Sequence, residues 1–268
     1  MSSKKKSSAF FVMASRQAIV DRILQLARNV HTVMGPHHPE AIYHACMKLA
    51  LLKNTPYRVE SKFGIPIHLP SSKNQVGQME ADLVVGQDHD VVVELKASKQ
   101  IEGLSQLRKY MRFYPFKEGL VLNFGRPDLA IYQCAALPAK TPFVAFPSQS
   151  TNLEGDWFHA LNKTAEQVYA ELGNDHSVTV YQKAMVSLLQ QVTSIHVQPN
   201  FHYGITYQGV QVGHDTIDIL INNTCAVNIK NNKKFQKTVN YDTSQKLFTS
   251  SMLINFGPEK MEWCFDKW

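Results

Sequence analysis

The second half of this 268-residue chain lacks arginine, and the last arginine in the sequence is Arg126. Residues 1–146 carry 19 Lys and Arg against 11 Asp and Glu, whereas residues 147–268 carry 9 against 11. Arginine binds phosphate through two parallel hydrogen bonds. A polyanionic partner is therefore expected to bind the first half of the chain.

The sequence also lacks any apolar run near the ~20 residues that a membrane span requires, so no membrane partner is expected. Its four cysteines form no C-x-x-C pair and no Cys/His set at zinc spacing. This pattern indicates reduced thiols and an intracellular location, cytoplasmic or nuclear. Residues 1–14, which contain three consecutive lysines, are expected to form a flexible basic tail.

Two short apolar runs that end in charged residues are the most informative feature present. The stretch ADLVVGQDHDVVVELKA places Asp82 in the first run, and Glu94 and Lys96 at the end of the second. The second run has the β-branched composition of a buried strand, so Val92, Glu94 and Lys96 are expected on one face. Two carboxylates and a lysine at one sheet edge predict a site for a hard divalent cation and an activated water. The alternative is a solvated cross-strand Glu–Lys pair.

Upstream, the sequence GPHHPEAIY predicts the start of a helix over about residues 38–53. Glu40 shares a helical face with Tyr43 and Met47, which would direct its carboxylate inward. The alternative interpretation is an acidic residue that stabilises a helix N-terminus.

Downstream, a helix is expected over about residues 103–114. Gln106 and Tyr110 are neighbours four residues apart on it, and Arg108, Lys109 and Arg112 lie on its other faces. In the functional interpretation, Gln106 and Tyr110 line the site, and the basic residues contact the phosphates of a nucleic acid. The alternative is an ordinary amphipathic helix with solvated cations.

In this order, GPHHPEAIY, Asp82 with Glu94-Leu95-Lys96, Gln106-x-x-x-Tyr110 and the strand LVLNFG resemble the GxxExxY proteins. These belong to the PD-(D/E)XK nuclease superfamily, on the branch with a RecB-like QxxxY motif. The resemblance covers about residues 16–135. Members occur in bacteria and large DNA viruses, among other places.

The resemblance implies a role for each motif residue. Glu40, Asp82 and Glu94 would be ligands of Mg²⁺ or Mn²⁺, and Lys96 would orient or activate the attacking water. Gln106 and Tyr110 would support the site. The family's usual basic residue two positions before the motif aspartate is replaced by Glu80, which adds a negative charge near the site.

The second half of the chain repeats the first. CAVNIK at 225–230 matches VVVELK at 91–96, and MLINFG at 252–257 matches LVLNFG at 120–125. The offset falls from 138 residues at Gly35 and Gly173 to 132 at Gly125 and Gly257, as a duplication with short deletions would leave. Val178 replaces Glu40 and Asn228 replaces Glu94, so the second copy is expected to be a degenerate pseudo-nuclease.

The predicted fold class is α/β, with two tandem restriction-endonuclease-like domains that each contain a mixed sheet flanked by helices. The expected boundaries are 15–137 for the first domain, 138–155 for the linker and 156–268 for the second domain. The two domains could form an intramolecular pseudo-dimer, or copies of the chain could form a homo-oligomer.

These patterns predict a metal-dependent nuclease that hydrolyses phosphodiester bonds of DNA, or of RNA, through its first domain. The alternative is a catalytically inactive nucleic-acid-binding or assembly protein built from two nuclease-like folds. A plain DNA- or RNA-binding module would instead bind with steep salt dependence and without a metal.

Overall fold

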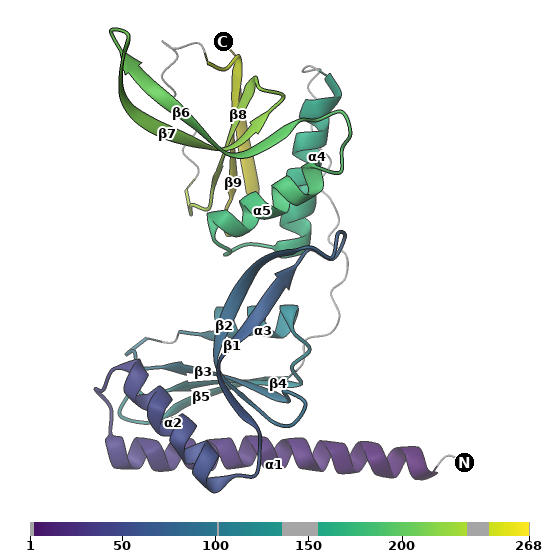
Figure 1. The fold of residues 1–268 in the computed structure, drawn as a ribbon. Coiled ribbons are helices and arrows are strands. Elements are labelled where there is room, and N and C mark those ends of the chain that lie inside the picture. Colours follow the sequence, from purple (N-terminus) through teal and green to yellow (C-terminus); the bar gives the residue numbers. More distant parts are fainter. Residues whose placement is uncertain (1–2, 101, 136–154, 235–246, 268) are drawn as a thin grey trace. The chain divides into compact units, whose positions relative to one another are not determined.

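The computed structural model describes residues 3–100, 102–135, 155–234 and 247–267 (Figure 1). The chain divides into two compact units. The first unit comprises Met1–Ile67 and Gln78–Lys140, and the second comprises His68–Gly77 and Thr141–Trp268. Residues 138–154 of the predicted linker lie outside the described residues.

The described elements of the two halves of the chain follow one another in a similar order. The first half contains α1 (Ser3–Met34), α2 (Glu40–Asn54), β1 (Val59–His68), β2 (Gln75–Val85), β3 (Val91–Lys96), α3 (Leu104–Phe113), β4 (Glu118–Asn123) and β5 (Ala130–Ala135). The second half contains α4 (Gly155–Leu172), α5 (Val178–Leu189), β6 (Val197–Tyr207), β7 (Val210–Ile221), β8 (Cys225–Lys230), β9 (Ser250–Phe256) and β10 (Met261–Lys267).

Each half forms a five-stranded mixed sheet, which confirms the predicted fold class. The strand orders are β1-β2-β3-β4-β5 and β10-β9-β8-β7-β6. β3 pairs with β4 in parallel, as β8 does with β9, while β2–β3, β4–β5, β7–β8 and β9–β10 are antiparallel. A parallel pair needs a crossover connection, and α3 supplies it between β3 and β4.

Helices cover both faces of the first sheet because its central strands are apolar on both sides. Val91, Val93 and Leu95 pack with α1 and α2 in one cluster. Val92 packs with Leu107 and Tyr110 of α3 in the other. The predicted alternation along β3 is therefore confirmed, and its even-numbered residues face α3.

A buried tyrosine joins the start of α2 to the sheet, and the second half repeats it. Tyr43 stacks on Phe124 with ring centroids 4.6 Å apart, and its hydroxyl donates a hydrogen bond to the Gly35 carbonyl at 2.6 Å. Tyr181 stacks on Phe256 at 4.2 Å and donates to the Gly173 carbonyl at 2.8 Å. The sequence repeat thus corresponds to a repeat of individual contacts.

The structure divides the chain differently from the expected boundaries at two places. The expected tail, residues 1–14, is helical from Ser3 onward as the start of α1, because a nucleated helix extends cheaply through lysine, alanine and methionine. Residues 68–77, expected in the first domain, group with the second unit. Their polar groups have partners there: the Ser71 N–H donates to Glu171 at 3.2 Å.

Within the described residues, no helix has the length and hydropathy needed to cross a membrane.

Tyr43→Phe should lower the free energy of unfolding of the first unit by about 1–3 kcal/mol, because the Gly35 carbonyl and the His38 N–H both lose a buried partner. Urea denaturation measures the loss. Tyr181→Phe should cost a similar amount in the second unit, whereas the exposed Tyr207→Phe should change stability by less than about 0.5 kcal/mol. Equal stability of Tyr43→Phe and wild type would contradict this account.

Candidate functional site

Asp82 and Glu94 meet across two antiparallel strands. β2 and β3 pair with Leu83 opposite Val93, so the same register places Asp82 opposite Glu94 on one face. Both side chains are buried. Asp82 Oδ2 accepts a hydrogen bond from the Leu95 backbone N–H at 2.9 Å, which fixes this carboxylate across the strand pair.

Lys96 lies between the carboxylates of Glu94 and Glu40. The alternation of side chains along the strand predicted that Glu94 would be its neighbour on the same face. Its Nζ is 2.6 Å from Glu94 Oε1 and 3.6 Å from Glu40 Oε2. The side chains of Glu94 and Lys96 are 2% and 15% exposed, whereas that of Glu40 is 44% exposed. Glu40 therefore reaches the edge of the site from the first turn of α2 and remains accessible to solvent.

Lys62 forms a second lysine bridge, which the sequence pattern did not reveal. Its Nζ is 2.9 Å from Asp82 Oδ1 and 3.5 Å from Glu80 Oε1. The residue has a φ of 57° within β1, an uncommon conformation for a residue with a Cβ. Lys62 thus brings a positive charge from the neighbouring strand to Glu80, the position where the family pattern has its own basic residue.

The predicted Gln106–Tyr110 pair lies on α3, directly over these groups. Gln106 donates to the Tyr110 hydroxyl, which donates to the Glu80 backbone carbonyl at 2.6 Å. The helix can approach because Gly103 precedes it with a φ of 93°. A Cβ on Gly103 would lie 3.1 Å from Val121 Cγ1, which is a tight contact, and 3.4 Å from Glu94 Cγ.

The predicted nucleic-acid-binding residues lie on α3 outside its buried face. Arg108 is exposed, and Lys109 and Arg112 are half-buried. The Arg112 guanidinium lies 5.3 Å from the ring centroid of Phe113, a distance typical of a cation–π contact.

Two further residues organise the site without belonging to the predicted set. His44 Nε2 lies 3.0 Å from the Asp82 carbonyl oxygen, which ties α2 to β2. Asn123 is fully buried, accepts a hydrogen bond from the Ser98 N–H and donates to the Gln100 carbonyl. It therefore shapes the segment that follows Lys96. Its recurrence as Asn255 in the matching MLINFG was the signal that could have identified it.

Burial dominates the electrostatics of the site. Burial raises the pKa of Glu94 to about 7, although the hydrogen bond from Lys96 acts in the opposite direction. Burial alone would lower the pKa of Lys96, but Glu94 and Glu40 outweigh it and raise that pKa. Burial and the charge of Glu94 raise the pKa of Tyr110. At neutral pH, Lys96 and Tyr110 therefore stay protonated, while Glu94 titrates.

The donor chemistry fits a divalent cation, but the side chains do not form a closed cage. Four carboxylates, from Glu40, Glu80, Asp82 and Glu94, face two ammonium groups, from Lys62 and Lys96. Glu94 Oε2 is buried and accepts no hydrogen bond from any described group. Among the described residues, no three His, Cys, Asp or Glu side chains are close enough together to hold a metal.

The second unit retains the backbone arrangement and changes the chemistry. Asp218 Oδ2 accepts a hydrogen bond from the Ile229 N–H at 2.7 Å, as Asp82 does from Leu95. The register of β7 and β8 places Asn228 opposite Asp218. Lys230 is exposed. One carboxylate beside an amide is a poor cation site.

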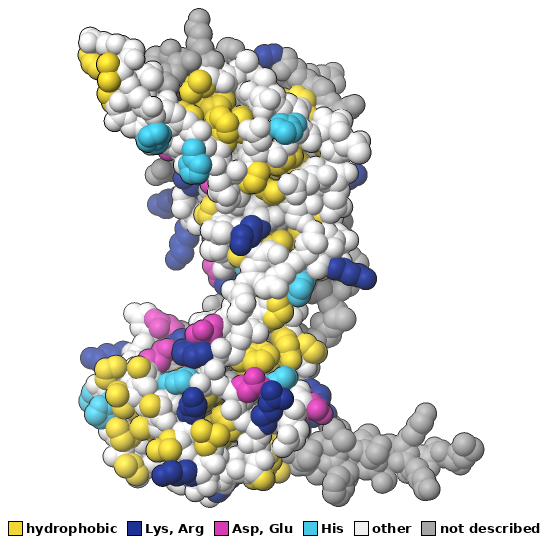
Figure 2. Space-filling model, in the orientation of Figure 1, with side chains coloured by type: hydrophobic (Ala, Val, Ile, Leu, Met, Phe, Trp, Pro, Cys, Tyr) yellow, Lys and Arg dark blue, Asp and Glu magenta, His cyan; other side chains and the backbone are white. Residues whose placement is uncertain are grey.

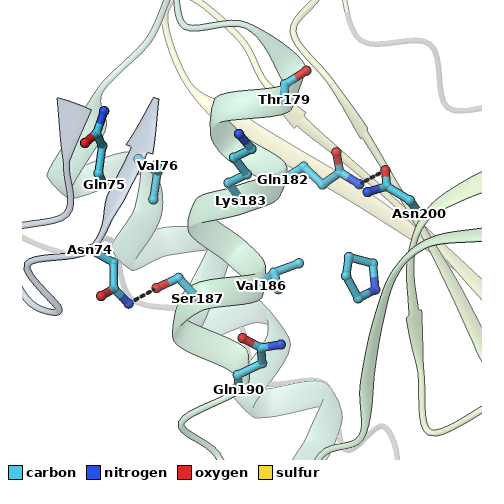
Figure 3. A pocket seen from close by; sticks show the side chains of 11 residues that line it. Asn74, Gln75, Val76, Thr179, Gln182, Lys183, Val186, Ser187, Gln190 and Asn200 are labelled. Atoms are coloured by element: carbon cyan, nitrogen blue, oxygen red, sulfur yellow. Dashed lines mark hydrogen bonds between the residues drawn. The ribbon is translucent and has the colours of Figure 1, made fainter. Parts of the chain in front are cut away.

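A separate cavity of about 660 Å³ lies in the second unit (Figure 3). One wall is the face of α5 that carries Lys183, Ser187 and Gln190, and the others come from residues 74–76 and from β6. The Asn74 side-chain amide donates to Ser187 Oγ at 2.7 Å across it. None of the described residues that line this cavity is acidic.

A family model described as the PD-(D/E)XK nuclease superfamily matches residues 17–133 and, separately, residues 155–264. No curated protein and no solved structure matches the chain.

In metal-free buffer, Glu94→Gln should be more stable than wild type at pH 8 and lose this advantage toward pH 5. The folded-state pKa of Glu94 is raised to about 7 from 4.5, so the folded protein binds more protons than the unfolded chain between these values, and wild-type stability falls as pH rises through them. Urea denaturation at several pH values measures the difference. A constant difference across this range would contradict the raised pKa, and Glu102→Gln, at an exposed position, is the control.

Proposed function

Because the chain belongs to the PD-(D/E)XK nuclease superfamily, we propose that its first unit is a metal-dependent nuclease that hydrolyses phosphodiester bonds of DNA or RNA. The observation that carries this proposal is the buried cluster of Asp82, Glu94 and Lys96, in which one Glu94 oxygen has no hydrogen-bond partner among the described groups. An unpaired buried carboxylate oxygen is costly unless a ligand uses it.

Glu40, Asp82 and Glu94 are the residues that would hold Mg²⁺ or Mn²⁺. When bound, such an ion supplies Lewis-acid stabilisation of the negative charge that builds on the phosphate. As a metal ligand, Glu94 would be ionised, because the positive charge of the ion favours the carboxylate over the acid. Lys96 stays protonated and would hold the attacking water through its ammonium group.

Supporting residues keep this arrangement in place. Tyr110 is protonated and bonded to the Glu80 carbonyl, so it holds α3 against β2. Gln106 fixes the Tyr110 hydroxyl. Arg108, with Lys109 and Arg112 on the same helix, would contact nucleic-acid phosphates, which supply most of the non-specific binding energy.

The second unit is proposed to be a degenerate copy of the first, in a chain of GxxExxY type. Its family match supports the common fold, and Asn228 in place of a glutamate removes the second carboxylate. The alternative function, a catalytically inactive nucleic-acid-binding or assembly protein, is favoured by one observation: no three acidic or histidine side chains of the described residues gather at metal-binding distance.

Cleavage of labelled single- and double-stranded DNA and RNA tests the proposal directly. Wild type should cleave at least one substrate with Mg²⁺ or Mn²⁺ and none with EDTA, and Asp82→Ala or Lys96→Ala should reduce the rate by about a hundredfold or more.

Asp218→Ala is the matched control, because Asp218 makes the same backbone hydrogen bond in the second unit. It should leave the rate unchanged. Absence of cleavage, or equal cleavage by wild type and Asp82→Ala, would reject nuclease activity in favour of the inactive alternative.

Lys62→Gln should lower the dissociation constant for Mn²⁺ by about two- to tenfold, because a metal on Asp82 must displace the ammonium group that now binds Oδ1. Isothermal titration calorimetry at pH 8 measures it. Arg58→Gln removes an equal charge from an exposed pair with Glu60 and should change the constant little. Glu94→Ala should abolish binding. Equal constants for wild type and Lys62→Gln would show that Lys62 does not compete with the metal.

A further inference from the structure

α2 presents an apolar stripe to solvent. The stripe, defined as Ala45, Leu49 and Leu52, follows the helical spacing of one face. Leu49 is 52% exposed and Leu52 is 54% exposed. A surface helix normally turns polar residues outward, and contiguous exposed apolar residues mark interaction sites. Figure 2 shows hydrophobic side chains gathered over this part of the first unit.

The sister helix α5 has polar residues at the same positions. The 138-residue offset aligns Ala45, Leu49 and Leu52 with Lys183, Ser187 and Gln190. This face of α5 receives a loop, because residues 74–76 line the cavity against it and Asn74 bonds to Ser187 (Figure 3). That loop joins β1 to β2. In this fold, therefore, this helix face accepts the turn of a β-hairpin.

The matching hairpin of the second unit, β6–β7, ends in exposed apolar residues. Gln208 and Gly209 form its turn with φ values of 50° and 79°, as a two-residue hairpin turn requires. Tyr207, Val210 and Val212 beside the turn are 66%, 65% and 61% exposed. We call these three residues the β6–β7 tip. The hairpin projects from its sheet, and hydrophobic side chains occupy its end (Figures 1 and 2).

We propose that the β6–β7 tip of one copy of this chain docks on the apolar stripe of α2 in a second copy. The contact would be the apolar counterpart of the polar contact between the β1–β2 loop and α5. Burying Leu49 and Leu52 against Tyr207 and its neighbours removes apolar surface from water on both sides.

A second copy of the chain is the partner because each chain carries both complementary surfaces, the stripe in the first unit and the tip in the second. The contact joins two different surfaces, so it is heterologous, and repetition yields a closed ring or an open filament. This inference does not depend on nuclease activity.

Sedimentation velocity over a wide range of wild-type concentrations is the first measurement, and self-association is expected. The stripe variant Ala45→Lys/Leu49→Ser/Leu52→Gln gives α2 the residues that α5 carries at the same positions, so it should fold. The tip variant is Tyr207→Ser/Val210→Thr/Val212→Thr, which keeps strand-forming residues. Each variant alone should raise the dissociation constant for self-association by about tenfold or more.

Mixing the two variants provides the decisive result. The stripe variant retains an intact tip and the tip variant retains an intact stripe, so an equimolar mixture should form a heterodimer that neither variant forms alone. Lys53→Gln, a polar exposed substitution on α2, should associate like wild type. If the triple variant fails to fold, Leu49→Ser alone should still weaken association.

Three results would overturn the proposal. Wild type could sediment as a monomer at every concentration. Either folded variant could associate as strongly as wild type. The mixture could fail to form heterodimers although each variant has lost self-association, which would exclude a contact between the tip of one copy and the stripe of another.

Discussion

The hydrogen bond from the Leu95 N–H to Asp82 Oδ2 is the constraint on which the site depends. A slip of one residue between β2 and β3 would turn every side chain to the opposite face, and this bond fixes the register where the strand pairing ends. The second unit keeps the same bond, from Ile229 to Asp218, beside Asn228. The aspartate therefore has a structural role in both units, and its presence alone is weak evidence for catalysis. Glu94 distinguishes the two units chemically.

Glu94 is a buried charge that lowers the stability of the first unit. Its carboxylate is buried, and burial outweighs the ion pair with Lys96, because desolvating a charge costs more than one close partner returns. The second unit avoids this cost with the neutral Asn228 and an exposed Lys230. Retaining a destabilising carboxylate in one copy only is the pattern expected when that copy performs chemistry, since activity and stability commonly oppose one another.

Much of this arrangement could be predicted from the sequence because it follows from local periodicity. Alternation along a strand placed Val92, Glu94 and Lys96 on one face, and the internal repeat gave two similar folds. Lys62 could not be predicted in this way, because its role depends on the pairing of β1 with β2 and on a left-handed backbone conformation that spacing does not encode. Composition likewise does not predict that the helix begins at Ser3, because this start depends on the extension of α1 toward the N-terminus. The grouping of residues 68–77 with the second unit depends on contacts between residues distant in the sequence, such as the hydrogen bond from Ser71 to Glu171.

The two copies of the fold also differ in the polarity of one helix face, which lies on α5 in the second unit and on α2 in the first. On α5 this face is polar, and the Ser187 hydroxyl meets the Asn74 amide. On α2 the matching position is Leu49, and the exposed hairpin tip of the second unit is apolar. Exchanging the two loops would bury Asn74 against leucine without a hydrogen-bond partner, and would place Tyr207 against the ammonium group of Lys183. Both mismatches carry desolvation costs. The sequence differences between the copies therefore discriminate against the wrong pairing as well as favouring the right one.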